Sequence, residues 1–254
     1  MPENSSNSDL HSYPVWDRTT RWFHWINALS ILILIFLGVM ILNVKTLGIP
    51  TDGKILLKQA HVLTGYIFVL NLFWRLIWGF IGGHYSLWRS ILPIGRDYWR
   101  SFGSYIRGSL KGHPPLYLGH NPLARLMVSV LFILLLLQAI TGLILAGTDL
   151  YYPPFGHEIA EQVTAAGEDH SKLERLRPGY TEGTNEAGYQ AMREWRAPVI
   201  ATHIITFYIL LAAIGLHLLG VVFTELREGG ALVSAMLTGR KYYSDKPVDS
   251  DKDE

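Results

Sequence analysis

The stretch "THIITFYILLAAIGLH", residues 202–217, decides the fold because it is an apolar run that carries two histidines. An ionisable side chain is costly in hydrocarbon, so a histidine inside a membrane span is a candidate functional residue. His203 and His217 are fourteen residues apart. This spacing returns them to nearly the same face of a helix, about 21 Å apart along its axis. The stretch therefore predicts a membrane helix with two sites on one face.

The composition indicates a membrane protein. Of 254 residues, 49% are hydrophobic and only 17% are charged, which is unusual for a soluble domain. Crossing a hydrocarbon core of about 30 Å takes about 20 helical residues. We expect an all-α membrane protein, a four-transmembrane-helix bundle, whose spans are approximately Trp25–Leu42, Leu63–Ile81, Leu123–Leu145 and Val199–Phe223. The absence of cysteine excludes disulfides, iron–sulfur clusters and covalently attached haem.

The basic residues predict which side each loop faces. Residues 83–122, between the second and third spans, are strongly basic and rich in aromatic residues, as in a helix that lies in the headgroup layer. Residues 148–196 hold nine acidic and five basic residues. The positive-inside rule makes the first loop cytoplasmic, the second loop external and both termini cytoplasmic.

Three regions follow along the chain. Residues 1–15 form a polar leader without the pattern of a cleavable signal. Residues 16–240 form the membrane domain, and residues 241–254 form a polar tail. Within the external loop, "TNEAGYQAMREWRAP" is expected to form a short helix before the last span.

The histidines of the spans match in depth. His24 lies near the inner end of the first span and His61 near the outer end of the second. The expected pairs are therefore His24 with His217 and His61 with His203. Two imidazoles at each of two depths suit metals whose other ligands are planar, and haem supplies that plane. Zinc and di-iron sites fit worse because the spans lack the carboxylates they need. The alternative is that the histidines form hydrogen bonds between helices.

Four further residues of the spans support haem binding. Gly38 is fourteen residues after His24, and Gly65 is one turn beyond His61, so each could let a flat macrocycle approach the backbone. Gly142 lies in the outer half of the third span. Arg75 is fourteen residues after His61 and could pair with a haem propionate. The alternatives are close helix packing for the glycines and snorkelling to the headgroups for Arg75. The remaining six histidines are expected to face solvent: His11, His84, His113, His120, His157 and His170.

Several motifs resemble one family. "WDRTTRWFHWINALS", "HVLTGYIFVLNLFWRLIWGFIG", "GHNPLA" and the spaced histidines of the last span are similar to the bacterial di-haem cytochrome b561 family, especially the b-type cytochrome subunits of nickel-iron hydrogenases. The resemblance covers Val15 to about Thr238. It implies that the axial ligands of two haem b groups are His24, His61, His203 and His217.

The resemblance also implies a function in the bacterial inner membrane. The expected activity is electron transfer between the quinone pool and a periplasmic hydrogenase or c-type cytochrome docked on the external loop, with a homo-oligomer as a possible assembly. Trp22, Asn27, Arg75 and His120 are candidates for lining the quinone site. Alternatives are a stand-alone superoxide:quinone oxidoreductase, which the acidic external loop disfavours, and a membrane anchor without haem. Asn121 and Pro122 are expected to begin the third span as N-cap and first helical residue.

Overall fold

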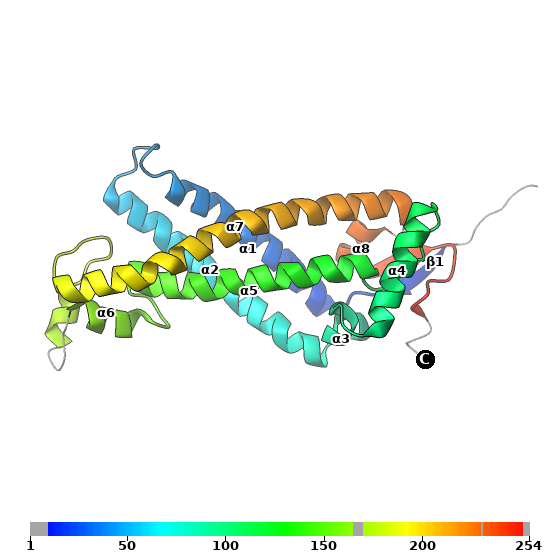
Figure 1. Cartoon of the computed structure of the whole chain (residues 1–254), viewed down its shortest axis with the longest axis horizontal. Coiled ribbons are helices and arrows are strands. Elements are labelled where there is room, and N and C mark those ends of the chain that lie inside the picture. Colours follow the sequence, from blue (N-terminus) through cyan, green and yellow to red (C-terminus); the bar gives the residue numbers. More distant parts are fainter. Residues whose placement is uncertain (1–9, 165–169, 230, 251–254) are drawn as a thin grey trace, which may run out of the picture. The chain divides into compact units, whose positions relative to one another are not determined.

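Four long helices dominate the computed structural model, which describes residues 10–164, 170–229 and 231–250 (Figure 1). They are α1 (Arg18–Leu42), α2 (Thr51–Ile81), α5 (Pro122–Leu150) and α7 (Glu186–Glu228). All four are long and apolar enough to cross a membrane, and at most 28% of each apolar stretch is buried by protein. Such helices need lipid to cover their apolar surface. The predicted four-span, all-helical membrane fold is confirmed.

Shorter elements connect the long helices. They are β1 (His11–Pro14), η1 (His84–Ser86), α3 (Trp88–Ile91), α4 (Arg96–Leu110), α6 (Gly156–Thr164), η2 (His170–Arg175), α8 (Leu232–Thr238) and β2 (Arg240–Tyr243).

The chain divides into two compact units, and every long helix contributes a segment to each. The terminal unit comprises residues 1–25, 73–132 and 211–254, and the loop unit comprises residues 26–72 and 133–210.

In the terminal unit, residues 11–14 of the expected polar leader pair with residues 240–243, where the expected polar tail begins, to form a two-stranded ribbon. β1 pairs with β2 in antiparallel register, with Tyr13 opposite Lys241. The Lys241 Nζ donates hydrogen bonds to the carbonyls of Tyr117 and Gly119, at 3.2 and 3.1 Å. The Asp249 carboxylate accepts from the backbone N–H groups of Leu118 and Gly119, at 2.6 and 3.0 Å. Lys241 and Asp249, both in the C-terminal segment, therefore hold the loop that precedes α5.

Asp17 begins α1 and connects it to two other elements of the terminal unit. Its carboxylate accepts from the Thr20 backbone N–H at 2.7 Å, which is the bond of a helix N-cap. It also accepts from Ser86 Oγ at 2.6 Å and Trp78 Nε1 at 3.2 Å. Burial raises the pKa of Asp17, but the hydrogen bonds from Ser86, Thr20 and Trp78 outweigh it and leave the pKa below its usual value.

The α4 helix is amphipathic, as the alternation of arginines and aromatic residues in this loop predicts. Tyr98 and Tyr105 are buried, whereas Trp99 is exposed. The Tyr105 hydroxyl donates to the Glu228 carboxylate at 2.5 Å and accepts from Asn121 Nδ2 at 2.9 Å. The first bond attaches α4 to the C-terminal end of α7, beside which it lies in Figure 1, and the second attaches α4 to the residue before α5.

In the loop unit, α7 begins well before the apolar run because α6 packs on its first turns. Ile159, Val163 and Met192 form a small buried core, and the Asn185 N–H donates to the Val163 carbonyl at 2.7 Å. The short helix expected before the last span is therefore the start of α7 itself. The helix continues through Pro198, although proline removes one backbone hydrogen bond.

An ionic cluster joins three long helices in the same unit. Asp149 forms ion pairs with Lys58 at 2.7 Å and with Arg196 at 2.6 Å. All three side chains are about one-fifth exposed. Arg196 also donates to the Thr148 hydroxyl at 3.1 Å. The cluster therefore links α2, α5 and α7.

Candidate functional site

The loop unit brings His61 and His203 together. Their ring centroids are 6.4 Å apart and the rings are inclined at 74°. The two rings come from α2 and α7, as the depth pairing predicts. The His61 Nδ1 is buried and has no hydrogen-bond partner in the described part of the chain.

The His203 imidazole, by contrast, is anchored by α5. Its Nδ1 lies 2.8 Å from the Thr141 hydroxyl. One turn earlier on α5, the Gln138 side-chain amide donates to the His203 carbonyl at 3.0 Å. Sequence reasoning missed both residues. A threonine and a glutamine inside an otherwise apolar run were the available signal, because buried polar groups need partners.

Glycines lie beside both rings of this pair. A Cβ built on Gly38 would be 3.6 Å from His61 Cε1, and one built on Gly142 would be 3.5 Å from His203 Cε1. The prediction that Gly38 lies at the depth of this pair is therefore confirmed. A Cβ built on Gly65 would meet nothing within 4 Å in the described structure. The backbone is accessible at these positions, as close approach of a flat cofactor requires.

The terminal unit holds His24 and His217. The two imidazoles are close enough to interact electrostatically, which agrees with the predicted pairing. The His24 Nδ1 is buried and has no hydrogen-bond partner among the described residues. The terminal unit therefore contains one histidine pair and the loop unit contains the other.

Arg75 is buried in the terminal unit with only 3% of its surface exposed. Its guanidinium packs on the rings of Trp88, Phe132 and Phe23, at 5.2, 5.5 and 5.8 Å from their centroids. The Nη2 donates to the Ser86 carbonyl at 2.9 Å, whereas the buried Nη1 has no partner within the described structure. The snorkelling alternative is wrong because the aromatic rings enclose the guanidinium. An unpaired donor on a buried cation is suited to an anionic ligand group.

The expectation that His120 faces solvent is wrong. Its Nδ1 is buried and has no hydrogen-bond partner in the residues described, and its ring contacts Trp16 at a centroid distance of 4.9 Å. Burial, together with the positive charges of Lys241 and Arg75, lowers the pKa of His120 to about 3. His120 is therefore neutral at physiological pH.

The other five histidines outside the spans differ in exposure. His11, His113 and His157 are exposed, as expected, and His84 is partly buried. His170 lies in η2, but its side chain is outside the described part of the structure.

Asn121 begins α5 as predicted, since its side-chain oxygen accepts from the Ala124 N–H at 2.8 Å. Pro122 is the first helical residue. His120 thus lies directly before the N-cap of α5.

The four candidates for the quinone site are only partly brought together. Arg75 and His120 interact electrostatically within the terminal unit. Trp22 is 70% exposed, as expected for a residue of the interfacial aromatic belt. Asn27 belongs to the loop unit and has a buried, unpaired side-chain oxygen as far as the structure is described.

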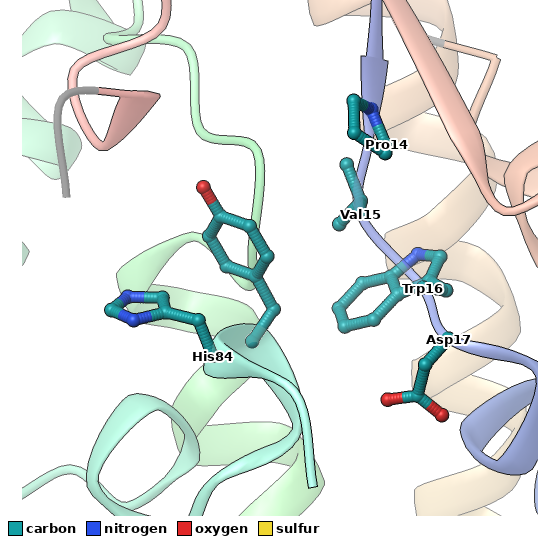
Figure 2. Close-up of a pocket in the computed structure, with 6 residues that line it drawn as sticks. Pro14, Val15, Trp16, Asp17 and His84 are labelled. Carbon is teal, nitrogen blue, oxygen red and sulfur yellow. The ribbon is translucent and has the colours of Figure 1, made fainter. Parts of the chain in front are cut away.

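A pocket of the terminal unit lies next to His120 rather than around the four candidates. Figure 2 shows Trp16 and Asp17 on one side of it and His84 on the other. Pro14, Val15 and Tyr85 complete the lining. Trp16 thus contacts both this pocket and the His120 ring.

The described residues fit haem. Outside the masked positions, no three His, Cys, Asp or Glu residues gather in a way that could hold a metal, so each histidine pair could supply only two ligands. Two imidazoles bound to one iron at about 2 Å place their ring centroids about 6 Å apart, close to the 6.4 Å between His61 and His203. Gly38 and Gly142, beside the two rings, leave the backbone open to the approach of a flat macrocycle.

Comparison with known proteins agrees with this fit. The family model described as prokaryotic cytochrome b561 matches residues 15–239. A probable Ni/Fe-hydrogenase B-type cytochrome subunit of Cupriavidus necator is 29% identical over 151 residues, covering 56% of this chain and 62% of the relative. The corresponding subunit of Rhodobacter capsulatus is 32% identical over 145 residues, covering 54% of each chain. A probable Ni/Fe-hydrogenase 1 subunit of Escherichia coli K12 is 26% identical over 163 residues, covering 61% of this chain and 68% of the relative.

The alignments with the first two relatives span less than two thirds of those proteins. The family match, by contrast, covers all four membrane spans. The chain therefore belongs to the prokaryotic cytochrome b561 family and is a multi-pass membrane protein.

Proposed function

We propose that this protein binds two haem b groups and transfers electrons between the quinone pool and a periplasmic redox partner, most simply a hydrogenase. The family name implies haem b. The proposed axial ligands are His61 and His203 in the loop unit, and His24 and His217 in the terminal unit. Haem with two imidazole ligands has no open coordination position, so it supplies one-electron outer-sphere transfer and not oxygen chemistry.

The proposed function depends mainly on the pairing of His61 with His203. They come from different helices, yet their rings are spaced as two ligands of one metal would be. Interhelical hydrogen bonding is the competing explanation, and it requires the rings to have hydrogen-bond partners. The unpartnered Nδ1 argues against it for His61, whereas His203 contacts Thr141 through Nδ1. Gly38, Gly65 and Gly142 would leave room for the macrocycle.

Arg75 is the proposed partner of a propionate in the terminal unit. Its Nη2 is held by the Ser86 carbonyl and its plane by aromatic rings, so the guanidinium is fixed with Nη1 free to donate. A fixed, buried cation binds a carboxylate more strongly than an exposed one because less water screens it.

The quinone site is proposed for the terminal unit, near His120 and the pocket beside Trp16. Neutral His120 has a buried Nδ1 available for a hydrogen bond with a quinone oxygen. Since residues 83–122 are basic, this unit is assigned to the cytoplasmic side of the bacterial inner membrane, with both termini. The acidic loop after α5 would then face the periplasm and dock the partner.

The relatives motivate the choice of partner. The proteins from Cupriavidus necator and Rhodobacter capsulatus carry the name of hydrogenase cytochrome subunits, and we extend that partner to this chain as part of the proposal. The external loop is long enough to offer a docking surface, as long loops in compact proteins often do.

The test is made on purified, full-length protein in lipid nanodiscs. Pyridine haemochrome analysis should give two haems per chain, and the reduced protein should be reoxidised by ubiquinone or menaquinone analogues. H120A should slow reoxidation while keeping the haem spectrum, whereas H61A should remove one haem. Protein without a Soret band, or haems that no quinone reoxidises, would refute the proposal.

A further inference from the structure

We infer that Thr141 is a positioning residue that fixes the tautomer of His203, so that the Nε2 of this imidazole is the nitrogen available to a metal. The inference deepens the proposed function and rests on it. It concerns only the histidine pair of the loop unit. It follows from the hydrogen bonds that the single proton of the Thr141 hydroxyl allows.

The Thr141 hydroxyl has a single proton to donate. Its oxygen lies 2.6 Å from the Leu137 carbonyl, one turn earlier on α5. A carbonyl can only accept, so the hydroxyl proton is committed to this bond. The oxygen must then accept at its 2.8 Å contact with His203 Nδ1. His203 therefore carries its proton on Nδ1, and its Nε2 keeps a free lone pair.

The backbone of His203 is fixed at the same level. Gln138 lies three residues before Thr141 on α5 and donates to the His203 carbonyl at 3.0 Å. Side chain and main chain of His203 are thus both held by one turn of α5. This geometry restricts rotation of the imidazole about its Cα–Cβ bond and orients the ring toward His61.

His61 lacks such an anchor. Its Nδ1 has no hydrogen-bond partner in the described residues. An acceptor on the second nitrogen of a ligating imidazole increases the basicity of the ligand and favours the more oxidised metal. Thr141 is therefore expected to lower the reduction potential of the haem in the loop unit and to leave the other haem unaffected.

The experiment compares three variants with the wild-type holoprotein. T141V keeps the shape of the side chain but removes the hydroxyl. T141S restores the hydroxyl. T64V is the matched control because the Thr64 hydroxyl also donates to a carbonyl one turn earlier, Ala60 at 2.9 Å, on a span of the same unit. Each is studied by optical redox titration, which resolves the two haems, and by haem quantification.

We expect T141V to raise the potential of one haem by about 59 mV, a tenfold change in its one-electron equilibrium. T141S and T64V should stay at the wild-type values. If T141V retains only one haem while T141S retains two, the positioning role is also supported. Two haems with unchanged potentials in T141V, or an equal shift in T64V, would overturn it.

A second measurement does not depend on bound haem. Histidine ¹⁵N NMR of the haem-free, full-length protein should show His203 protonated on Nδ1, and this state should be lost in T141V. A wild-type His203 protonated on Nε2 would overturn the inference. Wild-type protein that never binds haem would instead refute the proposed function, so the two failures are distinguishable.

Discussion

The two histidine pairs have the same chemistry but different surroundings. In the loop unit, His61 and His203 lie among glycines and one threonine. In the terminal unit, the pair shares its region with buried Arg75, neutral His120 and buried Lys241. A positive charge favours the reduced state of a nearby metal because reduction removes charge from it. If both pairs bind haem as proposed, the same two histidine ligands would give two different haem reduction potentials.

The largest expected effect tests whether the two pairs are separate sites. H61A and H203A should each remove one haem, and the double variant should lose no more than either single variant. H24A combined with H203A should remove both haems. Haem-to-protein ratios measured by pyridine haemochrome would check this. A single variant that removed both haems would show that the pairs are not independent.

The sequence was sufficient to predict the four spans and both pairings, because apolar length and helical periodicity determine them. It did not predict that α2 begins at Thr51 or α7 at Glu186. These turns lie outside the apolar runs and are stabilised by tertiary contacts such as the α6 packing.

The ribbon formed by β1 and β2 was missed for a similar reason. Each strand has four residues, too few for a recognisable alternation. The polar composition of both segments suggested exposure, yet Lys241 is 3% exposed. Its hydrogen bonds to two carbonyls compensate its burial, and such a partner is not visible in the sequence alone.

The second expected effect concerns stability, and it tests the ionic cluster of the loop unit. D149N should destabilise the protein by about 2 kcal/mol, because Lys58 and Arg196 would remain partly buried without their anion. D97N is the control, since the ion pair of Asp97 with Arg100 is largely exposed. Thermal unfolding in detergent should show a clear decrease for D149N and none for D97N. Equal melting temperatures for D149N and the wild type would show that the ionic cluster does not stabilise the loop unit.

In the terminal unit, Asp17 has the corresponding role but a smaller expected effect. D17N should cost about 1 kcal/mol because the amide keeps one acceptor oxygen for the N-cap but loses the second acceptor oxygen and the charge-assisted hydrogen bonds. Because folding lowers the pKa of Asp17, this stabilisation is present above its unfolded pKa of about 4. It is lost as the pH falls through the lower, folded value. Melting temperatures of D17N and wild type should therefore converge in acid, and a constant difference down to that range would contradict the assignment.

The last expected effect concerns Lys241 of the terminal unit and its response to alkaline pH. Burial lowers the pKa of Lys241 to about 8, and Asp249, Glu228 and Glu225 oppose the shift. Between pH 8 and about 10, the unfolded chain binds more protons at this residue than the folded chain, since the ordinary lysine pKa is about 10.4. Stability contributed by the residue therefore rises with pH in this window and is independent of pH below it.

K241M keeps the length of the side chain without a titrating group. The difference in melting temperature between wild type and K241M should change in favour of the wild type from pH 8 to 10. Burial also raises the pKa of nearby Tyr243 and Tyr117, but both tyrosines remain in the variant, so their titration largely cancels in the difference. A difference that stays flat across this window would mean that Lys241 is solvated like a surface lysine. The ribbon formed by β1 and β2 would then stabilise the terminal unit less than its hydrogen bonds suggest.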